Sequence, residues 1–275
     1  MTLHTALLQG AQILEDARIS VPRLTAEVLL SHAVHCERSF LYAHPERELK
    51  EVEWIHYGRY LHERLAGKPT QYITGRQEFY GREFRVTPDV LIPRPETEHL
   101  VETAVKFLEP GARIVDAGCG SGAIAISVAL ELHTPVVASD ISREALAVAR
   151  RNAQMLAAPV DFVAGDLLTP FASQAFDAVL SNPPYVPLHA RASLQREVRD
   201  YEPEVALFGG PTGNEIYAAL FAQAARVLKP AGLLIVELGF GSLDAVTRMA
   251  ETGWQDVTTS DDLAGIPRVL AAKLK

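Results

Sequence analysis

The sequence predicts an α/β protein with a doubly wound, mostly parallel sheet, preceded by a small N-terminal helical domain and a β-hairpin-like connector. From residue 96 onward, short apolar runs alternate with helix-length amphipathic stretches, which is typical of a parallel sheet covered by helices. The first 70 residues instead have apolar side chains at helical spacing and no strand-like run. We therefore expect a helical domain over residues 1–70, a connector over 71–95 and an α/β domain over 96–275.

Composition narrows the possible classes of protein. The chain has 275 residues, 48% of them hydrophobic and 22% charged, as in ordinary folded proteins. Its net charge of -8 has the wrong sign for general binding to phosphate backbones, so no direct contact with nucleic acid is expected. Cys36 and Cys119 have neither disulfide nor metal-ligand spacing, which predicts no metal site and favours the cytoplasm. No apolar run approaches 18 residues, so no membrane association is expected.

The helical domain is predicted from two amphipathic stretches. Their apolar faces consist of Leu7, Ala11 and Leu14, and of Trp54, Tyr57, Leu61 and Leu65. Six of the nine histidines lie here without ligand spacing, so we interpret them as ordinary surface or core residues. Residues 71–95 then change to aromatic and β-branched residues broken by glycine and proline, which predicts the hairpin-like connector.

Five apolar runs predict the strands of the α/β domain. They cover residues 114–116, 136–140, 162–166, 178–182 and 233–237. After the second run, Ser142 is expected to cap a helix whose apolar positions run from Ala145 to Ala153.

A glycine-rich loop, Gly118-Cys119-Gly120-Ser121-Gly122, follows the first predicted strand. Glycines at alternate positions let the backbone turn sharply and approach a ligand, and the next helix offers its N–H groups and positive dipole end. Dinucleotide-binding enzymes use a related loop, but the last glycine of their G-x-G-x-x-G pattern is displaced here. Cys119 is interpreted as a small loop residue.

Asp140, Asp166 and Asn182 each end one apolar run. In an open α/β sheet these positions meet at the rim where ligands bind. Asp140 suits the two hydroxyls of a ribose, although an acid at this position can also serve only to stabilise the following helix. Asp166 is expected where an adenine amino group would be recognised.

The tetrapeptide Asn182-Pro183-Pro184-Tyr185 follows the fourth run. Its two prolines fix the backbone and leave the carbonyl groups free to accept hydrogen bonds. The Asn182 side-chain oxygen and the Pro183 carbonyl can each accept one N–H of a planar NH₂ group, and Tyr185 offers a flat face for stacking. The predicted acceptor is therefore an amide or an exocyclic amino group.

With these motifs the chain resembles the S-adenosylmethionine-dependent amino methyltransferases, which have a Rossmann-like domain. Within them it resembles the release factor glutamine methyltransferases, the PrmC/HemK family, over residues 65–270. The further motifs that carry this resemblance are Pro69 to Gly75, Glu78-Phe79, Val90 to Glu98, Glu202-Pro203, Ala206-Leu207, Glu237-x-Gly239 and Gly265-x-x-Arg268.

The resemblance implies the cofactor, the substrate and the site residues. The cofactor would be S-adenosylmethionine, with Gly118 to Gly122 and Asn182 lining it, Asp140 holding its ribose and Leu167 beside its adenine. Asn182 to Tyr185 would bind the glutamine of a Gly-Gly-Gln motif in a class I peptide chain release factor, and its side-chain nitrogen N5 would be methylated. The helical domain would help to dock that protein. The chain departs from the family pattern at Leu167, at 212–214 and at Ser242.

Three other functions remain open. A DNA adenine-N6 methyltransferase would use the same tetrapeptide, but the chain shows no target-recognition insert and is acidic. A nicotinamide-dependent dehydrogenase leaves Asn182 to Tyr185 unexplained. A non-catalytic binding module of the translation machinery would account for a separate helical domain.

Overall fold

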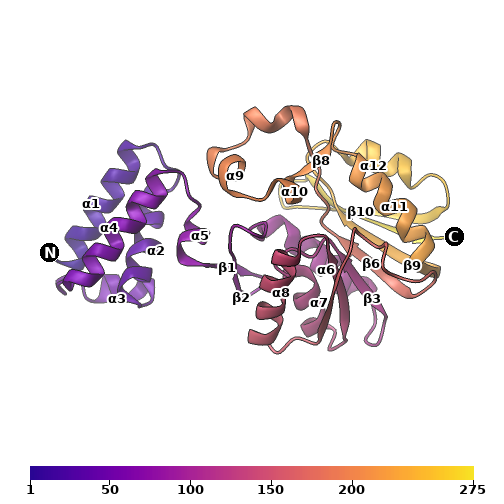
Figure 1. The fold of residues 1–275 in the computed structure, drawn as a ribbon, viewed down its shortest axis with the longest axis horizontal. Helices are drawn as coiled ribbons and strands as arrows, with labels where there is room; N and C mark the ends of the chain where they lie inside the picture. Colours follow the sequence, from indigo (N-terminus) through magenta and orange to yellow (C-terminus); the bar gives the residue numbers. More distant parts are fainter. The chain divides into compact units, whose positions relative to one another are not determined.

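The computed structural model describes all residues, 1–275, and they form two compact units (Figure 1). One unit contains residues 1–76 together with 195–201, and the other contains residues 77–194 and 202–275. The helical unit therefore extends past residue 70. It also includes a short segment from the range 96–275 that the sequence analysis assigned to the α/β domain.

The first unit is built from helices. They are α1 (Leu3–Asp16), α2 (Pro22–Val34), α3 (Arg38–Ala43), α4 (Glu51–Leu65), α5 (Thr70–Thr74) and α9 (Arg196–Tyr201). Leu7, Leu14, Tyr57 and Leu61 are buried in its core, as their spacing predicts. Trp54 is an exception: it lies at the edge of the buried stripe of α4 and is 40% exposed.

Helix α9 belongs to this unit because of a buried arginine. The Arg64 side chain in α4 is buried, and its Nη2 donates to Glu197 Oε2 in α9 over 2.6 Å. Tyr201 Oη also donates to the carbonyl of Ala66, 3.1 Å away. A buried guanidinium requires a carboxylate partner, and here that partner comes from a distant part of the sequence.

The connector forms the expected hairpin. Strands β1 (Arg76–Phe79) and β2 (Arg82–Arg85) make a two-stranded sheet around a turn at Tyr80 and Gly81. Phe79 and Phe84 are fully buried in the core of the second unit, with their rings edge to face and 6.0 Å apart.

The second unit contains the predicted doubly wound sheet. Its seven strands lie in the order β10-β11-β9-β6-β3-β4-β5, and all neighbours from β9 to β5 are parallel. The strands are β3 (Ile114–Ala117), β4 (Val136–Asp140), β5 (Val160–Ala164), β6 (Phe176–Ser181), β9 (Leu228–Glu237), β10 (Trp254–Asp261) and β11 (Pro267–Leu274). The antiparallel pair β10 and β11 was not predicted; it extends the sheet beyond β9.

Helices cover both faces of this sheet (Figure 1). One face carries α6 (Glu98–Phe107), α7 (Ala123–Glu131) and α8 (Arg143–Met155); the other carries α11 (Glu215–Val227) and α12 (Leu243–Met249). Ile114 and Val115 enter the two separate cores, as alternation along a strand requires. Ser142 caps α8 as predicted, because its Oγ accepts from the N–H of Ala145 over 3.0 Å.

Short elements occupy two connections of this unit. The 3₁₀ helix η1 (Pro95–Thr97) precedes α6, and β7 (Val186–Pro187), the 3₁₀ helix η2 (Leu188–Ser193), α10 (Glu204–Leu207) and β8 (Phe208–Gly210) lie between β6 and α11. None of the helices in the structure has the length and apolarity needed to cross a bilayer.

Candidate cofactor and acceptor site

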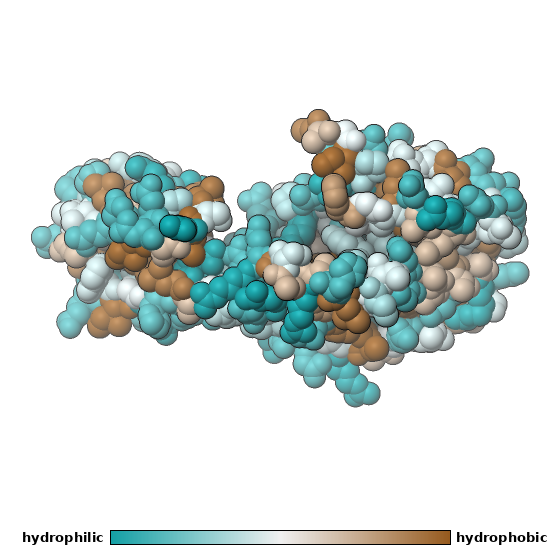
Figure 2. All heavy atoms as spheres, turned by 90° about the horizontal axis from the view of Figure 1, so that it is seen from above, coloured by the Kyte–Doolittle hydropathy of each residue, from teal (hydrophilic) through white to brown (hydrophobic).

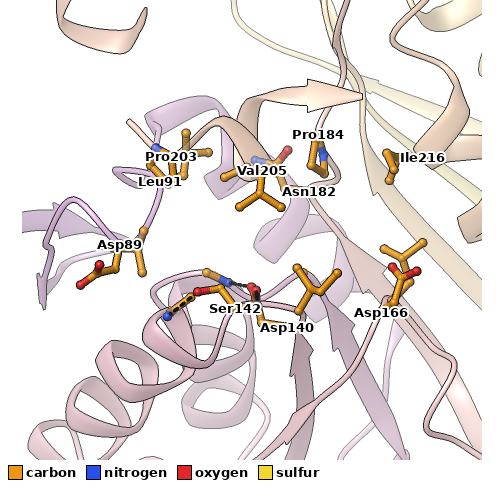
Figure 3. A pocket seen from close by; sticks show the side chains of 17 residues that line it. Asp89, Leu91, Asp140, Ser142, Asp166, Asn182, Pro184, Pro203, Val205 and Ile216 are labelled. Carbon is orange, nitrogen blue, oxygen red and sulfur yellow. Dashed lines mark hydrogen bonds between the residues drawn. The ribbon is translucent and has the colours of Figure 1, made fainter. Parts of the chain in front are cut away.

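A pocket lies at the carboxyl ends of the parallel strands (Figure 3). Seven of the twelve predicted site residues line it, and five do not. Those that line it are Gly118, Gly120, Asp140, Asp166, Leu167, Asn182 and Pro184. The other five are Cys119, Ser121, Gly122, Pro183 and Tyr185.

The glycine loop presents its backbone to the pocket. The N–H groups of Gly118 and Cys119 both donate to the carbonyl of Ser139, over 2.8 and 2.9 Å. Gly118 and Gly120 have φ angles of +75° and +54°, which L side chains rarely adopt. A Cβ on either glycine would have no protein atom within 4 Å. The loop thus leaves a space that a ligand can fill.

Cys119, Ser121 and Gly122, the remaining loop residues, do not line the pocket but pack against the rest of the protein. Cys119 is buried, and burial raises the pKa of its thiol, so it is an unreactive loop residue at neutral pH. The carbonyl of Ser121 accepts from Asn152 Nδ2 over 2.9 Å. A Cβ on Gly122 would lie 2.9 Å from Ile126 Cδ1, so only glycine lets the helix pack this closely.

Asp140 connects the loop to the next helix. Its Oδ2 accepts from the N–H of Gly120 and its Oδ1 from the N–H of Ser142, both over 2.8 Å (Figure 3). The carboxylate thus stabilises the start of α8 and also lines the pocket. Each carboxylate oxygen has a second lone pair, so Asp140 retains the capacity to accept from two ribose hydroxyls.

The charge of the pocket is negative. Asp89, Asp140 and Asp166 line it, and no lysine or arginine does. Asp116 lies fully buried in β3 before the loop; its Oδ1 has no hydrogen-bonding partner, and burial raises its pKa to about 7. An acidic pocket favours a ligand with positive charge over the diphosphate of a nicotinamide dinucleotide.

Apolar side chains form the rest of the wall. Ile141 and Val205 are 58% and 55% exposed, although both line the pocket. Leu167 is held by its carbonyl, which accepts from Ser139 Oγ over 2.7 Å. Exposed apolar side chains around a concave site suit a flat ring such as adenine.

Several of these lining residues were not predicted from the sequence. Ile141 directly follows Asp140, and an apolar residue after an acid at the end of a strand could have been predicted to line the pocket. Residues 89–91 overlap the motif from Val90 to Glu98 that carried the family resemblance. Pro203 belongs to a motif that carried the family resemblance but was not assigned to the site, and Val205, the second residue of α10, had no local signal.

Residues Asn182 to Tyr185, which we call the acceptor loop, place Asn182 at the pocket and Tyr185 beside it. Asn182 Nδ2 donates to Thr97 Oγ1 over 3.1 Å, which leaves Oδ1 as the free acceptor. Pro183 is buried outside the pocket. The Tyr185 ring packs on Gly239, and burial raises the pKa of its phenol to about 12, so Tyr185 is no base at neutral pH.

These residues fit S-adenosylmethionine. The open positions above Gly118 and Gly120, the Asp140 carboxylate and the apolar wall match a nucleoside, and the acidic lining matches its sulfonium and ammonium charges. No group of histidine, cysteine, aspartate and glutamate side chains in the structure is arranged to hold a metal ion.

Comparison with solved structures agrees with this fold. A methyltransferase from Pyrococcus furiosus is 21% identical, with a TM-score of 0.55 over 72% of this chain and 90% of that one. A 16S rRNA N2 G1207 methyltransferase from Thermus thermophilus, solved with AdoMet and guanosine, is 18% identical, with a TM-score of 0.53 over 73% and 50% of the two chains. Fold and pocket together define an S-adenosylmethionine-dependent methyltransferase.

Sequence comparison identifies the family. Residues 5–75 match the PrmC N-terminal domain, and residues 96–199 match the methyltransferase small domain. A release factor glutamine methyltransferase from Koribacter versatilis is 43% identical over 99% of both chains. One from Nitratidesulfovibrio vulgaris is 42% identical over 99% of this chain and 95% of its own. The chain belongs to the release factor glutamine methyltransferase family.

Proposed function

We propose that the protein methylates the side-chain nitrogen N5 of the glutamine in the Gly-Gly-Gln motif of a class I peptide chain release factor, in the cytoplasm. The observation that carries this proposal is the position of Asn182, whose amide lies on the wall of an acidic pocket fit for S-adenosylmethionine. The names of the full-length relatives support the choice of release factor.

On the cofactor side, the protein supplies shape and charge. When bound, S-adenosylmethionine provides a methyl group on a positively charged sulfur. Gly118 and Gly120 would let the backbone approach it, Asp140 would accept hydrogen bonds from the ribose, and Ile141 and Leu167 would cover the adenine.

On the acceptor side, the protein supplies orientation. An amide nitrogen is a poor nucleophile because its lone pair is delocalised into the carbonyl. Asn182 Oδ1 and the carbonyl of Pro183 would each accept one N–H of the glutamine, which would turn its nitrogen toward the methyl group. Pro184 lines the pocket, and Tyr185 lies beside it. Alignment of this kind contributes roughly 7–11 kcal/mol in favourable cases. In the transfer, the new nitrogen–carbon bond would replace the sulfur–carbon bond of the cofactor, and the nitrogen would then release one proton to water.

We further propose that the helical domain docks the protein substrate, with the connector joining it to the methyltransferase domain. Large apolar side chains are exposed on this unit, among them Val21, Val52 and Ile55 at 64%, 54% and 59%. Figure 2 shows hydrophobic residues at the surface of this unit. Exposed apolar surface of this kind is available to a protein partner and supports the proposal.

The test is incubation with methyl-labelled S-adenosylmethionine and a bacterial class I release factor, followed by mass spectrometry of the Gly-Gly-Gln peptide. One added methyl group on that glutamine, absent with Asn182→Ala, is the expected result. A release factor carrying asparagine in place of that glutamine is the matched control. Cofactor binding without any methylated release factor would refute the proposal, and label in duplex DNA would favour an adenine-N6 methyltransferase.

A further inference from the structure

Glu237 is a buried carboxylate with no role in the reaction described above. It ends β9, is 2% exposed and does not line the pocket. Its side chain has one hydrogen-bonding partner, Thr97, whose Oγ1 donates to Oε2 over 2.5 Å. Thr97 is itself buried, at 4% exposure, and its hydroxyl is the group that receives the N–H of Asn182. The three side chains therefore form a continuous chain from the core to the acceptor loop.

The direction of the hydrogen bonds in this chain follows from the available protons. An ionised carboxylate only accepts, and a hydroxyl has a single proton to donate. The Thr97 proton therefore goes to Glu237, and the Thr97 oxygen can only accept from Asn182. The amide of Asn182 must then direct its NH₂ group toward Thr97 and its oxygen toward the pocket. A protonated Glu237 removes this constraint, because it can donate to Thr97 and let Thr97 donate to Asn182 Oδ1.

We infer that Glu237 and Thr97 are positioning residues that set the orientation of the Asn182 amide, so that the charge of a buried carboxylate determines whether the pocket presents a hydrogen-bond acceptor. This inference rests on the proposed function, in which Asn182 Oδ1 receives an N–H of the substrate amide. Neither residue touches the reacting atoms.

The surroundings of Glu237 allow its charge to change near neutral pH. The titratable groups that face it are Arg94, Glu96, Tyr185, Tyr217 and Arg268. Arg94 and Arg268 are hydrogen-bonded to other carboxylates, at 2.5 and 2.8 Å, and Tyr217 Oη donates to the backbone carbonyl of Glu237 over 2.7 Å. Burial raises the pKa of Glu237 to about 7. As the pH rises through about 7, Glu237 therefore loses its proton, and the Asn182 amide turns its oxygen toward the pocket.

The orientation of Asn182 is measurable without any substrate. The chain has three asparagines, Asn152, Asn182 and Asn214, so labelling asparagine with nitrogen-15 produces only three side-chain NH₂ signals. We expect the Asn182 signal to shift with a midpoint near pH 7 and to lose this titration in Glu237→Gln. Asn152, whose NH₂ group donates to two backbone carbonyls elsewhere, is the internal control and should not change. An Asn182 signal that ignores both pH and the Glu237 substitution overturns the inference.

Activity provides the second readout. With release factor as substrate, kcat should rise through pH 7 in the wild type and stay flat there in Glu237→Gln. Thr97→Val should lower kcat about tenfold, the value of one ordinary hydrogen bond, with the Kd for S-adenosylmethionine unchanged. Thr97→Ser, which keeps the hydroxyl, should remain within about twofold of wild type. A pH dependence that survives in Glu237→Gln would assign the titration to another group, such as Asp116, and reject the role of Glu237. If the wild type methylates no release factor, the proposed function fails while the NMR titration still decides the orientation.

Discussion

Gly239→Ala tests whether catalysis depends on the exact position of the acceptor loop, because Tyr185 of this loop packs on Gly239. A Cβ added to Gly239 would lie 2.5 Å from Tyr185 Cδ2 and 2.7 Å from its Cγ, whereas ordinary contacts at a Cβ begin at 3.4 Å. The Tyr185 ring must therefore move by about 1 Å. Gly239 does not have a positive φ angle, so alanine strains no backbone torsion there.

The displacement should reduce catalysis more than cofactor binding. Tyr185 follows two prolines that fix the loop backbone, so its shift is passed to Asn182 rather than absorbed. A misplacement of about 1 Å can cost about 100-fold in rate, and overpacking costs about 1–3 kcal/mol of stability. We expect kcat for release factor methylation to fall between 10- and 100-fold, with the Kd for S-adenosylmethionine changed less than twofold.

The assay is steady-state methyl transfer together with calorimetric titration of the cofactor. Gly232→Ala is the matched control, because Gly232 lies inside β9, seven residues before Gly239, and its Cβ would meet Lys229 O at 2.9 Å. That variant should lose stability but keep its kcat. A folded Gly239→Ala enzyme with wild-type kcat would refute the reasoning, and an equal loss in Gly232→Ala would show general packing damage.

Three further predictions concern binding and stability. Asp140→Asn should weaken S-adenosylmethionine about 10- to 100-fold in calorimetry, because one charge-assisted acceptor is lost; an unchanged Kd would remove Asp140 from the site. Asn152→Ala should cost about 3 kcal/mol in chemical unfolding, since its buried side chain satisfies three backbone groups, the N–H and carbonyl of Arg85 and the carbonyl of Ser121; a loss under 1 kcal/mol would contradict this. Asp116 keeps its proton in the folded state up to a pKa of about 7 but in the unfolded state only to about 4, so stability should fall by up to about 4 kcal/mol as pH rises from 4 to 7. Asp116→Asn should flatten that slope, and an unaltered slope would assign it to other groups.

The sequence predicted the parallel part of the sheet because β3, β4 and β6 are short, mostly apolar runs that are largely buried on both faces; β5, at the edge of the sheet, is only partly buried. It did not predict β10, whose residues after Trp254 are largely polar and exposed, as an edge strand allows. The place of α9 in the helical unit was also not predicted, because an ion pair between Arg64 and Glu197 produces no periodic pattern in the sequence.

The pocket was predictable where a motif encodes a backbone shape. Alternating glycines, strand-end acids and paired prolines identified most of its polar wall. The link from Asn182 through Thr97 to Glu237 was not predictable, although each residue lies in a motif that the sequence analysis names, because only the fold brings positions 85 and 140 residues apart into hydrogen-bonding distance.

Because of the path of the chain through α9, the two units cannot be separated by a single cut in the sequence. The chain leaves the α/β unit after Leu194 and returns to it at Glu202, having spent seven residues inside the helical unit. A gene fragment that ends at residue 76 would separate Arg64 from Glu197, its only carboxylate partner, and would separate α9 from the helices of its unit. Exchange of the N-terminal domain between relatives should therefore carry residues 195–201 along with it, because these residues complete the helical unit.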